Sequence, residues 1–366
     1  SAPGAPDPDA PVFQGPDTAA DPGGIVRPSE ALPDRDTTQD QGLRYHALFN
    51  PTVAPLRRNV AFGQVEPDYR LTLRESPLVP VPLSTRAAQP GRELFWGDVT
   101  LNLEPGRAAA VPSVAPDMGI LAVRPEPDVA VTFLKDGADN YYLRANHRGP
   151  LRVVFLVDAD SAYFSGDVPG NVPLGVGADD PDARLPPEAA AAGRRVLDAL
   201  GVGAADPFDR GLDRLVAYFR GFRSGPPPPR RGDLYEDLAL GGVGVCRHRA
   251  LGFMVTARAA GVPTRVVHNE AHAFIEVRAP DGRWRRVDLG GEAPSLDLEG
   301  GQGRRLHSPP PDAFPKPDAY LEQYSSMLAR GVPPADQPDA AKVNGAPPGL
   351  GPGPGTGGSG GGGGAP

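Results

Sequence analysis

The one cysteine of the chain, Cys246, stands where a glycine-containing approach meets the start of a helix pattern. His272 follows inside an alternating apolar segment, and Asp288 ends the segment after that. A thiol, an imidazole and a carboxylate on three successive elements are the parts of a nucleophilic triad, in which the histidine activates the thiol and the acid orients the histidine. The pattern therefore predicts covalent acyl-transfer chemistry.

The first positioning element is a helix over residues 246–260. Its residues are apolar nearly all round, which is typical of a buried helix, and Gly261 with Pro263 supplies the stop. Cys246 falls in the first turn of this helix. Unpaired backbone N–H groups and the positive end of the helix dipole favour thiolate over thiol there.

The other two elements are expected to be a strand hairpin. Alternation over residues 271–277 predicts a strand with His272 on a definite face. The sequence Pro-Asp-Gly-Arg at 280–283 is typical of a turn, and residues 283–289 provide the return strand. This hairpin brings Asp288 alongside His272.

Around these residues the chain resembles the transglutaminase-like superfamily, a branch of the papain-like cysteine fold. The matching motifs are Gly-Val-Cys-Arg-His-Arg-Ala, Ala-Gly-Val-Pro-Thr-Arg-Val-Val, His-Ala-Phe-Ile-Glu-Val and Trp-Arg-Arg-Val-Asp, within residues 186–291. The resemblance implies that Cys246 is the nucleophile, His272 the general base and acid, and Asp288 the orienting group. It departs at Phe274, where many members have tryptophan. The chemistry implied requires no cofactor and no metal, although some relatives use calcium.

Further residues near the triad are candidates for the oxyanion hole or for substrate contacts: Tyr235, Val245, Arg247, His248 and Glu270. Tyr235 is the nearest upstream candidate for the oxyanion hole, and its alternative is a core tyrosine. His248 is either a polar surface group or a contact to an anionic substrate. Glu270 is either a contact to the site or the solvated start of a strand.

Two other interpretations of the cysteine stay open. A lone cysteine is often a small buried hydrophobe without chemistry. Cys246, His248, His268 and His272 can also be counted as a zinc set, but Cys-x-His is poor ligand spacing. The ordered histidine and aspartate favour the catalytic interpretation over both.

Composition limits the remaining function classes. The chain has 366 residues with 47 glycines, 47 prolines and a net charge of −8, and no basic stripe with aromatics, which argues against nucleic-acid binding. No apolar run is long enough to span a bilayer. The single cysteine allows no internal disulfide and does not reveal the compartment. Tethers of envelope proteins and exported chains have compositions like that of the N-terminal segment, so an exported or envelope-associated protein is one interpretation.

The expected organisation is α+β, with a papain-like transglutaminase core preceded by an antiparallel β-sandwich domain. Residues 1–41 are rich in Pro, Ala and Asp and are expected to be disordered and to add little stability. Residues 42–170 hold short alternating segments separated by turns, which predicts the sandwich. Residues 171–332 carry helices followed by the catalytic strands, and residues 333–366 are a Gly/Pro-rich tail.

The expected function is a cysteine enzyme acting on amide or peptide bonds of a protein or peptide substrate through a thioester. Few aromatics flank the triad, and its arginines would repel a lysine acceptor: Arg247, Arg249, Arg265, Arg285 and Arg286. Hydrolysis by a protease, amidase or deamidase is therefore favoured over protein cross-linking. A non-catalytic peptide-binding scaffold of the cell envelope is the other alternative, and the oligomeric state is left open.

Overall fold

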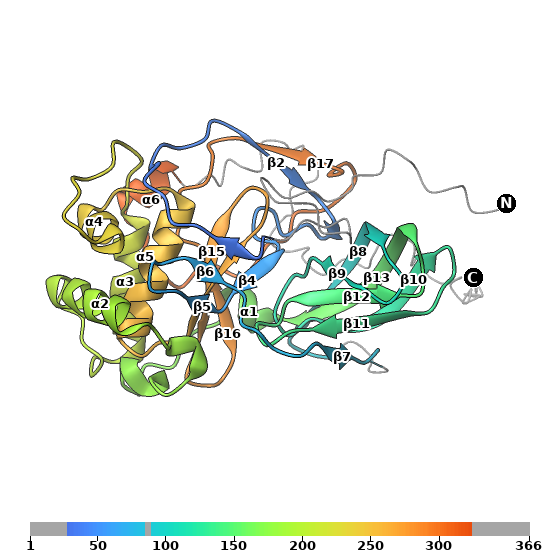
Figure 1. Cartoon of the computed structure of the whole chain (residues 1–366), viewed down its shortest axis with the longest axis horizontal. Coiled ribbons are helices and arrows are strands. Elements are labelled where there is room, and N and C mark those ends of the chain that lie inside the picture. The colour runs from blue at the N-terminus through green and yellow to red at the C-terminus, as the bar shows by residue number, and fades with distance from the viewer. Residues whose placement is uncertain (1–27, 85–88, 324–366) are drawn as a thin grey trace, which may run out of the picture.

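The computed structural model describes residues 28–84 and 89–323. Two regions lie side by side along its long axis, one built of strands and the other of helices around a smaller sheet (Figure 1). This is a mixed α+β arrangement with the antiparallel sheets first in the chain, as the sequence predicts. Residues 1–27 and the expected tail at 333–366 lie outside the described part.

The strand region contains two four-stranded antiparallel sheets. One has the order β10-β13-β8-β3 and the other β7-β11-β12-β9. Their bounds are β3 Phe49–Asn50, β7 Val79–Val81, β8 Arg92–Leu103, β9 Ala108–Val111, β10 Gly119–Glu126, β11 Val131–Lys135, β12 Tyr141–Ala145 and β13 Gly149–Asp160. Alternate side chains of β8 and β13 are buried, and the two sheets share one apolar core in which the rings of Phe133 and Phe155 are 5.6 Å apart.

The helical region is organised around one buried helix, α5 (Cys246–Ala259). It is covered by α2 (Pro187–Leu200), α3 (Phe208–Arg220) and α4 (Leu234–Gly241). Against α5 packs an antiparallel sheet of order β16-β15-β14-β4. Its bounds are β4 Val60–Phe62, β14 Thr264–His268, β15 Ala273–Arg278 and β16 Trp284–Val287. The expected helix and hairpin around Cys246, His272 and Asp288 are therefore present.

The two regions are joined more closely than the expected boundary at residue 170 implies. Strand β4 comes from the first half of the chain but pairs with β14, with Val60 opposite His268 and Phe62 opposite Val266. Helix α1 (Ser161–Ser165) follows the last strand of the first region and packs on β16. The sheet next to α5 is thus completed by residues from outside the helical region.

A buried charged cluster lies where the regions meet, and we call it the Glu276 cluster. The Glu276 carboxylate accepts from Arg58 Nε at 2.6 Å and from the Tyr163 hydroxyl at 2.8 Å. The other guanidinium nitrogens of Arg58 donate to Ser113 Oγ at 2.9 Å and to the carbonyls of Ala138 and Asp139. Each charged group in this cluster has partners, so the cluster joins the two regions.

An N-terminal strap, residues 30–42, corrects the expectation that residues 1–41 form one disordered segment. Glu30–Ala31 forms β1, which pairs with β6 (Leu71–Thr72) beside β5 (Gln64–Val65). Thr37 is fully buried and its hydroxyl donates to the Gly225 carbonyl at 2.5 Å. Arg35 forms an ion pair with the buried Asp237 at 2.8 Å. Local composition missed the strap because these partners lie about two hundred residues away.

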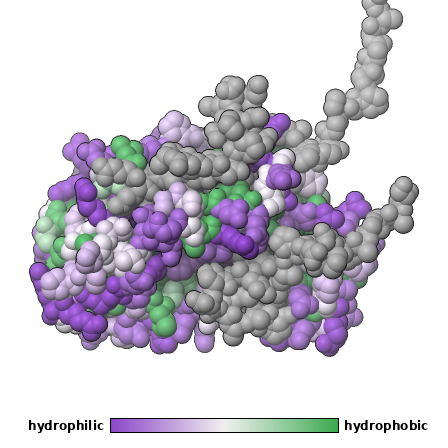
Figure 2. All heavy atoms as spheres, turned by 90° about the horizontal axis from the view of Figure 1, so that it is seen from above, coloured by the Kyte–Doolittle hydropathy of each residue, from purple (hydrophilic) through white to green (hydrophobic). Residues whose placement is uncertain are grey.

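The C-terminal part of the described chain returns over the same side. Strand β17 (Leu296–Glu299) pairs in parallel with β2 (Leu43–His46), and α6 (Asp318–Gln323) follows. Within residues 28–84 and 89–323, no helix has the length and apolarity needed to cross a membrane. Seen from above, the described surface is mainly hydrophilic with small separate apolar areas (Figure 2).

Candidate active site

Cys246 is the first residue of α5 and is half-buried. Its backbone N–H donates to the Gly291 carbonyl at 3.0 Å. A Cβ on Gly291 would come within 2.8 Å of the Cys246 nitrogen, and one on Gly244 within 2.5 Å of the His248 Cβ. Two glycines therefore allow the loops on either side of the thiol to pack closely around the end of the helix.

His272 and Asp288 meet as the sequence predicts. His272 Nε2 and Asp288 Oδ1 are 2.9 Å apart, and the same oxygen accepts the Gly290 N–H at 2.9 Å. The side chain of Asn269 accepts the backbone N–H of His272 at 2.8 Å and fixes the turn that leads into β15. The carboxylate holds the ring through Nε2, which leaves Nδ1 for the thiol.

The imidazole is held in its charged form. Burial alone would lower the pKa of His272, but the Asp288 carboxylate, its hydrogen bond and the Cys246 sulfur raise it well above its usual value. Nδ1 is buried and has no hydrogen bond of normal geometry. The Cys246 thiol is therefore one of the groups that raise the pKa of the ring, although no hydrogen bond joins it to Nδ1. The arrangement suits a thiolate–imidazolium pair.

Glu292 is a further acid at this site that the sequence interpretation missed. The residue is 2 % exposed, and neither carboxylate oxygen has a hydrogen-bond partner. Burial and then the negative charge of Asp288 raise the pKa of Glu292 to about 7. A signal existed in the sequence: Glu292 is an acid directly after the Gly290-Gly291 pair that closes the site strand. We call His272, Asp288 and Glu292 the His272 cluster.

Arg247 and His248 both hold a carboxylate, and it belongs to the strap. Asp34 accepts from Arg247 Nε at 2.6 Å and lies 3.1 Å from His248 Nε2. His248 is 3 % exposed, and its Nδ1 accepts the Val245 N–H at 3.3 Å. The surface interpretation of His248 was wrong: the ring caps α5 and binds an acid of the same chain. The Val245 N–H is used in this cap.

The strap crosses the end of α5 that carries Cys246. On one side Asp34 and the carbonyl of Asp36 contact Arg247. On the other side the Gln39 side-chain amide donates to the Glu292 carbonyl. Cys246 therefore lies beneath a segment from the start of the described chain.

Comparison with known proteins agrees with this arrangement. Residues 196–289 match the family model of the transglutaminase-like superfamily. The chain contains a transglutaminase-like domain. This confirms the resemblance drawn from the motifs around Cys246, His272 and Asp288.

Solved structures to which this chain shows similarity include the periplasmic domain of TgpA from Pseudomonas aeruginosa. It is 16% identical, with a TM-score of 0.42, over 72% of this chain and 93% of that chain. The same domain bound to ethylmercury is 17% identical, with a TM-score of 0.43, over 72% and 95%. No curated protein sequence matches the chain.

Two expected site residues of the transglutaminase-like domain lie elsewhere. The Tyr235 hydroxyl is 2.6 Å from Thr256 Oγ1, ten residues along α5 from Cys246, or ~15 Å at the helical rise. It is a core tyrosine and not an oxyanion donor. Glu270 accepts two hydrogen bonds from Arg57, at 2.6 and 2.5 Å, and one from Asn59 at 3.1 Å. The Glu270 carboxylate is therefore used to bind Arg57 and Asn59, which precede β4, and it is not free for a substrate contact.

The alternative zinc set of Cys246, His248, His268 and His272 does not form one group of ligand atoms among the described residues. Among residues 28–84 and 89–323, the one grouping with metal-ligand spacing is the His272 cluster, whose ligand atoms lie within 4.8 Å of one another. The hydrogen bond between His272 and Asp288 already joins two of these groups, so we interpret the grouping as an acid–base cluster. His268 stays neutral beside it, because burial and then the charge of His272 lower its pKa to about 4.

Most of the arginines expected to surround the site are engaged elsewhere. Arg249 donates to the carbonyls of Arg220 and Leu289, at 3.1 and 2.7 Å. Arg265 pairs with Asp139 and Asp182, and Arg285 with Asp281 at 2.7 Å. Arg247 is neutralised by Asp34. The cationic field that the sequence suggested is therefore weaker than expected, because three of the five arginines are paired with acids and Arg249 is bound by backbone carbonyls. The guanidinium of Arg286 forms no ion pair or hydrogen bond with the residues that the structure describes.

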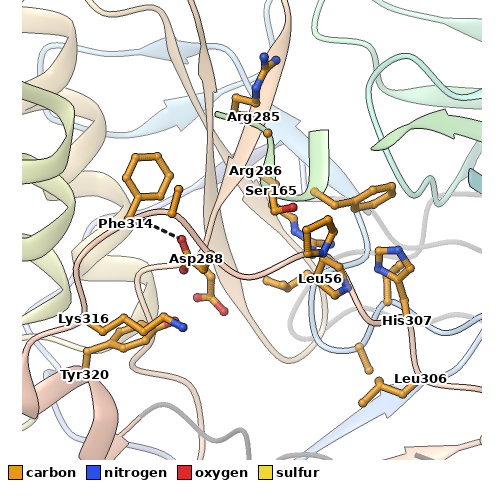
Figure 3. A pocket seen from close by; sticks show the side chains of 18 of the residues that line it. Leu56, Ser165, Arg285, Arg286, Asp288, Leu306, His307, Phe314, Lys316 and Tyr320 are labelled. Atoms are coloured by element: carbon orange, nitrogen blue, oxygen red, sulfur yellow. Dashed lines mark hydrogen bonds between the residues drawn. The ribbon is translucent and has the colours of Figure 1, made fainter. Parts of the chain in front are cut away.

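A pocket of about 270 Å³ adjoins the site at Asp288. Arg286 and Ser165 lie next to each other, and Asp288 lies between this pair and the side formed by Phe314, Lys316 and Tyr320 (Figure 3). Cys246 is not among its lining residues. The pocket thus meets the candidate site at Asp288 and not at the thiol.

Proposed function

We propose that the chain is a cysteine enzyme that cleaves amide or peptide bonds through a thioester on Cys246. The observation that carries the proposal is the His272 ring, held at Nε2 by Asp288 with Nδ1 left toward the sulfur. Membership of the transglutaminase-like superfamily supports the same chemistry.

In the proposed reaction, the Cys246 thiolate attacks the carbonyl carbon and the new C–S bond forms. His272 gives its proton to the leaving nitrogen as the C–N bond breaks, which leaves a thioester. His272 then takes a proton from water, the hydroxide oxygen bonds to the carbonyl carbon, and the C–S bond breaks to release the acid and the thiolate. Asp288 keeps the ring in the required tautomer throughout.

Water is the proposed acceptor. Arg286 and Lys316 line the pocket beside Asp288, and both repel an incoming ammonium group without affecting water. A polypeptide is the proposed acyl donor, because the strap already crosses the site as an extended segment.

A second candidate function is peptide binding without turnover. The observation that favours it is the hydrogen bond from the Cys246 N–H to the Gly291 carbonyl, because this N–H is the donor that an oxyanion would need. One oxyanion donor contributes about 3–4 kcal/mol in a protease where it was removed. Turnover therefore requires the loop at Gly291 to move away from the helix end.

A glutamine-containing peptide offered together with a fluorescent primary amine tests both candidates and the acceptor. Ammonia release or peptide cleavage that exceeds amine incorporation, and that disappears in Cys246→Ala and His272→Ala, is the expected result. Incorporation that dominates at millimolar amine would identify a cross-linking enzyme instead. Binding of the peptide with no turnover, and slow alkylation of Cys246 by iodoacetamide at neutral pH, would favour the second candidate.

A further inference from the structure

Arg286 is a buried cation without a partner. It is 8 % exposed, its Nη1 is buried, and among the residues that the structure describes no ion pair or hydrogen bond engages its guanidinium. Burying a charge is unfavourable unless an opposite charge or several hydrogen bonds compensate it. The ring of Phe164 lies 5.1 Å from the guanidinium carbon and gives a cation–π contact.

Nearby acids do not supply the missing charge. Glu276 lies opposite Arg286 in the β15–β16 pairing, but its carboxylate binds Arg58 and Tyr163. Asp288 directly follows β16, and its Oδ1 holds His272. His307, which also lines the pocket, lies 2.6 Å from Glu93.

A second unpartnered donor lies beside Arg286. The hydroxyl oxygen of Ser165, the last residue of α1, is buried and has no hydrogen-bond partner. Ser165 and Arg286 adjoin each other on the pocket wall, and Arg285, which also lines the pocket, points its guanidinium away from both (Figure 3). A guanidinium fork next to a hydroxyl matches the two oxygens of a carboxylate.

The rest of the pocket is mainly apolar. Its walls include Leu56, Phe164, Leu296, Leu306 and Phe314, and Lys316 lies at the opposite side from Arg286. A volume of about 270 Å³ is at the small end for a ligand pocket, so one amino-acid residue is a suitable occupant. The apolar walls and the donors of Arg286 and Ser165 together fit a ligand that has an apolar group and a negative charge.

We infer that this pocket binds the C-terminal residue of a peptide, with the α-carboxylate on Arg286 and Ser165 and an apolar side chain among the leucines and phenylalanines. The site is separate from the acyl transfer proposed for Cys246, and its test is a binding measurement. It adds to that function a place where a peptide bearing a free carboxylate is held next to Asp288.

The test uses the full chain with N-acetyl-leucine, its neutral analogue N-acetyl-leucinamide, and inorganic phosphate, measured by calorimetric titration. The acid is expected to bind saturably and the amide at least about tenfold more weakly, since a hydrogen-bonded charge is removed. Arg286→Gln is expected to weaken binding of the acid by about tenfold or more, and Ser165→Ala by roughly threefold. Equal binding of acid and amide, binding of phosphate alone, or no binding at all would each overturn the inference.

Arg285→Gln is the matched control, because Arg285 precedes Arg286 on β16 but its guanidinium pairs with Asp281. This variant is expected to bind N-acetyl-leucine like the parent chain. Without ligand, Arg286→Gln is expected to raise the thermal midpoint, because an uncompensated buried charge is removed. A lowered midpoint in Arg286→Gln would show that Arg286 is a structural group and would refute its role as a vacant anion site.

Discussion

The Glu276 cluster and the His272 cluster both use the β15–β16 hairpin. Glu276 lies within β15, whereas His272 directly precedes β15 and Asp288 directly follows β16. In the Glu276 cluster each charge has partners from both regions of the molecule. In the His272 cluster four polar atoms have none: His272 Nδ1, Asp288 Oδ2 and both oxygens of Glu292.

This difference separates two uses of buried charge. Charged groups whose hydrogen bonds are all formed hold the two regions together, and their contribution to stability is lost only when a partner is removed. Charged groups with unused hydrogen-bonding atoms can bind the reacting groups, but they make the folded state less stable. Matched amide substitutions in the two clusters should therefore affect different properties.

The largest effect is expected for Asp288→Asn. The amide leaves the His272 ring in place but favours the wrong tautomer, and the same change in a serine triad lowers kcat by about 10⁴. Steady-state turnover of the peptide substrate measures this, with the thermal midpoint as the check on folding. Turnover at the parent rate would mean that another group orients the imidazole.

Glu276→Gln is the counterpart in the saturated cluster. It leaves Arg58 buried without its carboxylate and should destabilise the chain by about 3–5 kcal/mol. Urea unfolding measures the loss, and turnover per folded molecule should be unchanged. A variant that unfolds like the parent chain would show that Ser113 and the two carbonyls suffice for Arg58.

Glu292→Gln should change the pH dependence more than the rate. The pKa of Glu292 is raised to about 7 in the folded chain, so the folded state binds the proton of this carboxyl more tightly than the unfolded chain does. This contribution to folding stability is complete at pH values below 4.5, the ordinary pKa of the group, and is lost as the pH rises through 7. The glutamine variant should therefore be more stable than the parent chain at pH 8, by about 3 kcal/mol, and not at pH 4.5.

The same variant should move the basic limb of the pH–rate profile to lower pH. Ionised Glu292 is one of the charges that raise the pKa of His272, so its removal makes the imidazolium lose its proton earlier. Urea midpoints and kcat/KM across pH 4.5–9 test both parts. A basic limb that stays in place would exclude Glu292 from the proton balance of the site.

The smallest expected effect concerns the strap. Removing residues 1–41 deletes the buried Thr37 and the Arg35–Asp237 and Asp34–Arg247 pairs, and should lower the thermal midpoint by roughly 5 °C. Removing residues 1–27 keeps these contacts and serves as the control. Equal midpoints for both truncations would show that the strap adds no stability, as composition alone had suggested.

Local patterns predicted the parts of this site that local forces determine. The periodicity of α5, the β15–β16 hairpin and the order of Cys246, His272 and Asp288 can all be seen within fifty residues of sequence. The strap could not be seen this way, because Arg247 and Asp34 are 213 residues apart. The same holds for Glu270, whose acid is used by Arg57, and for Tyr235, whose hydroxyl bonds Thr256.

The pairing of β4 with β14 limits how far the transglutaminase-like domain can be treated as a module. A fragment cut from the chain at residue 171 would lack Val60–Phe62 and leave β14 as an open sheet edge. That edge is mostly buried in the intact chain, and an uncovered apolar edge recruits strands from other molecules. A protein fragment that contains only the family-matched segment should therefore aggregate. A chimeric protein that receives this segment would also need β4, the strand that pairs with β14.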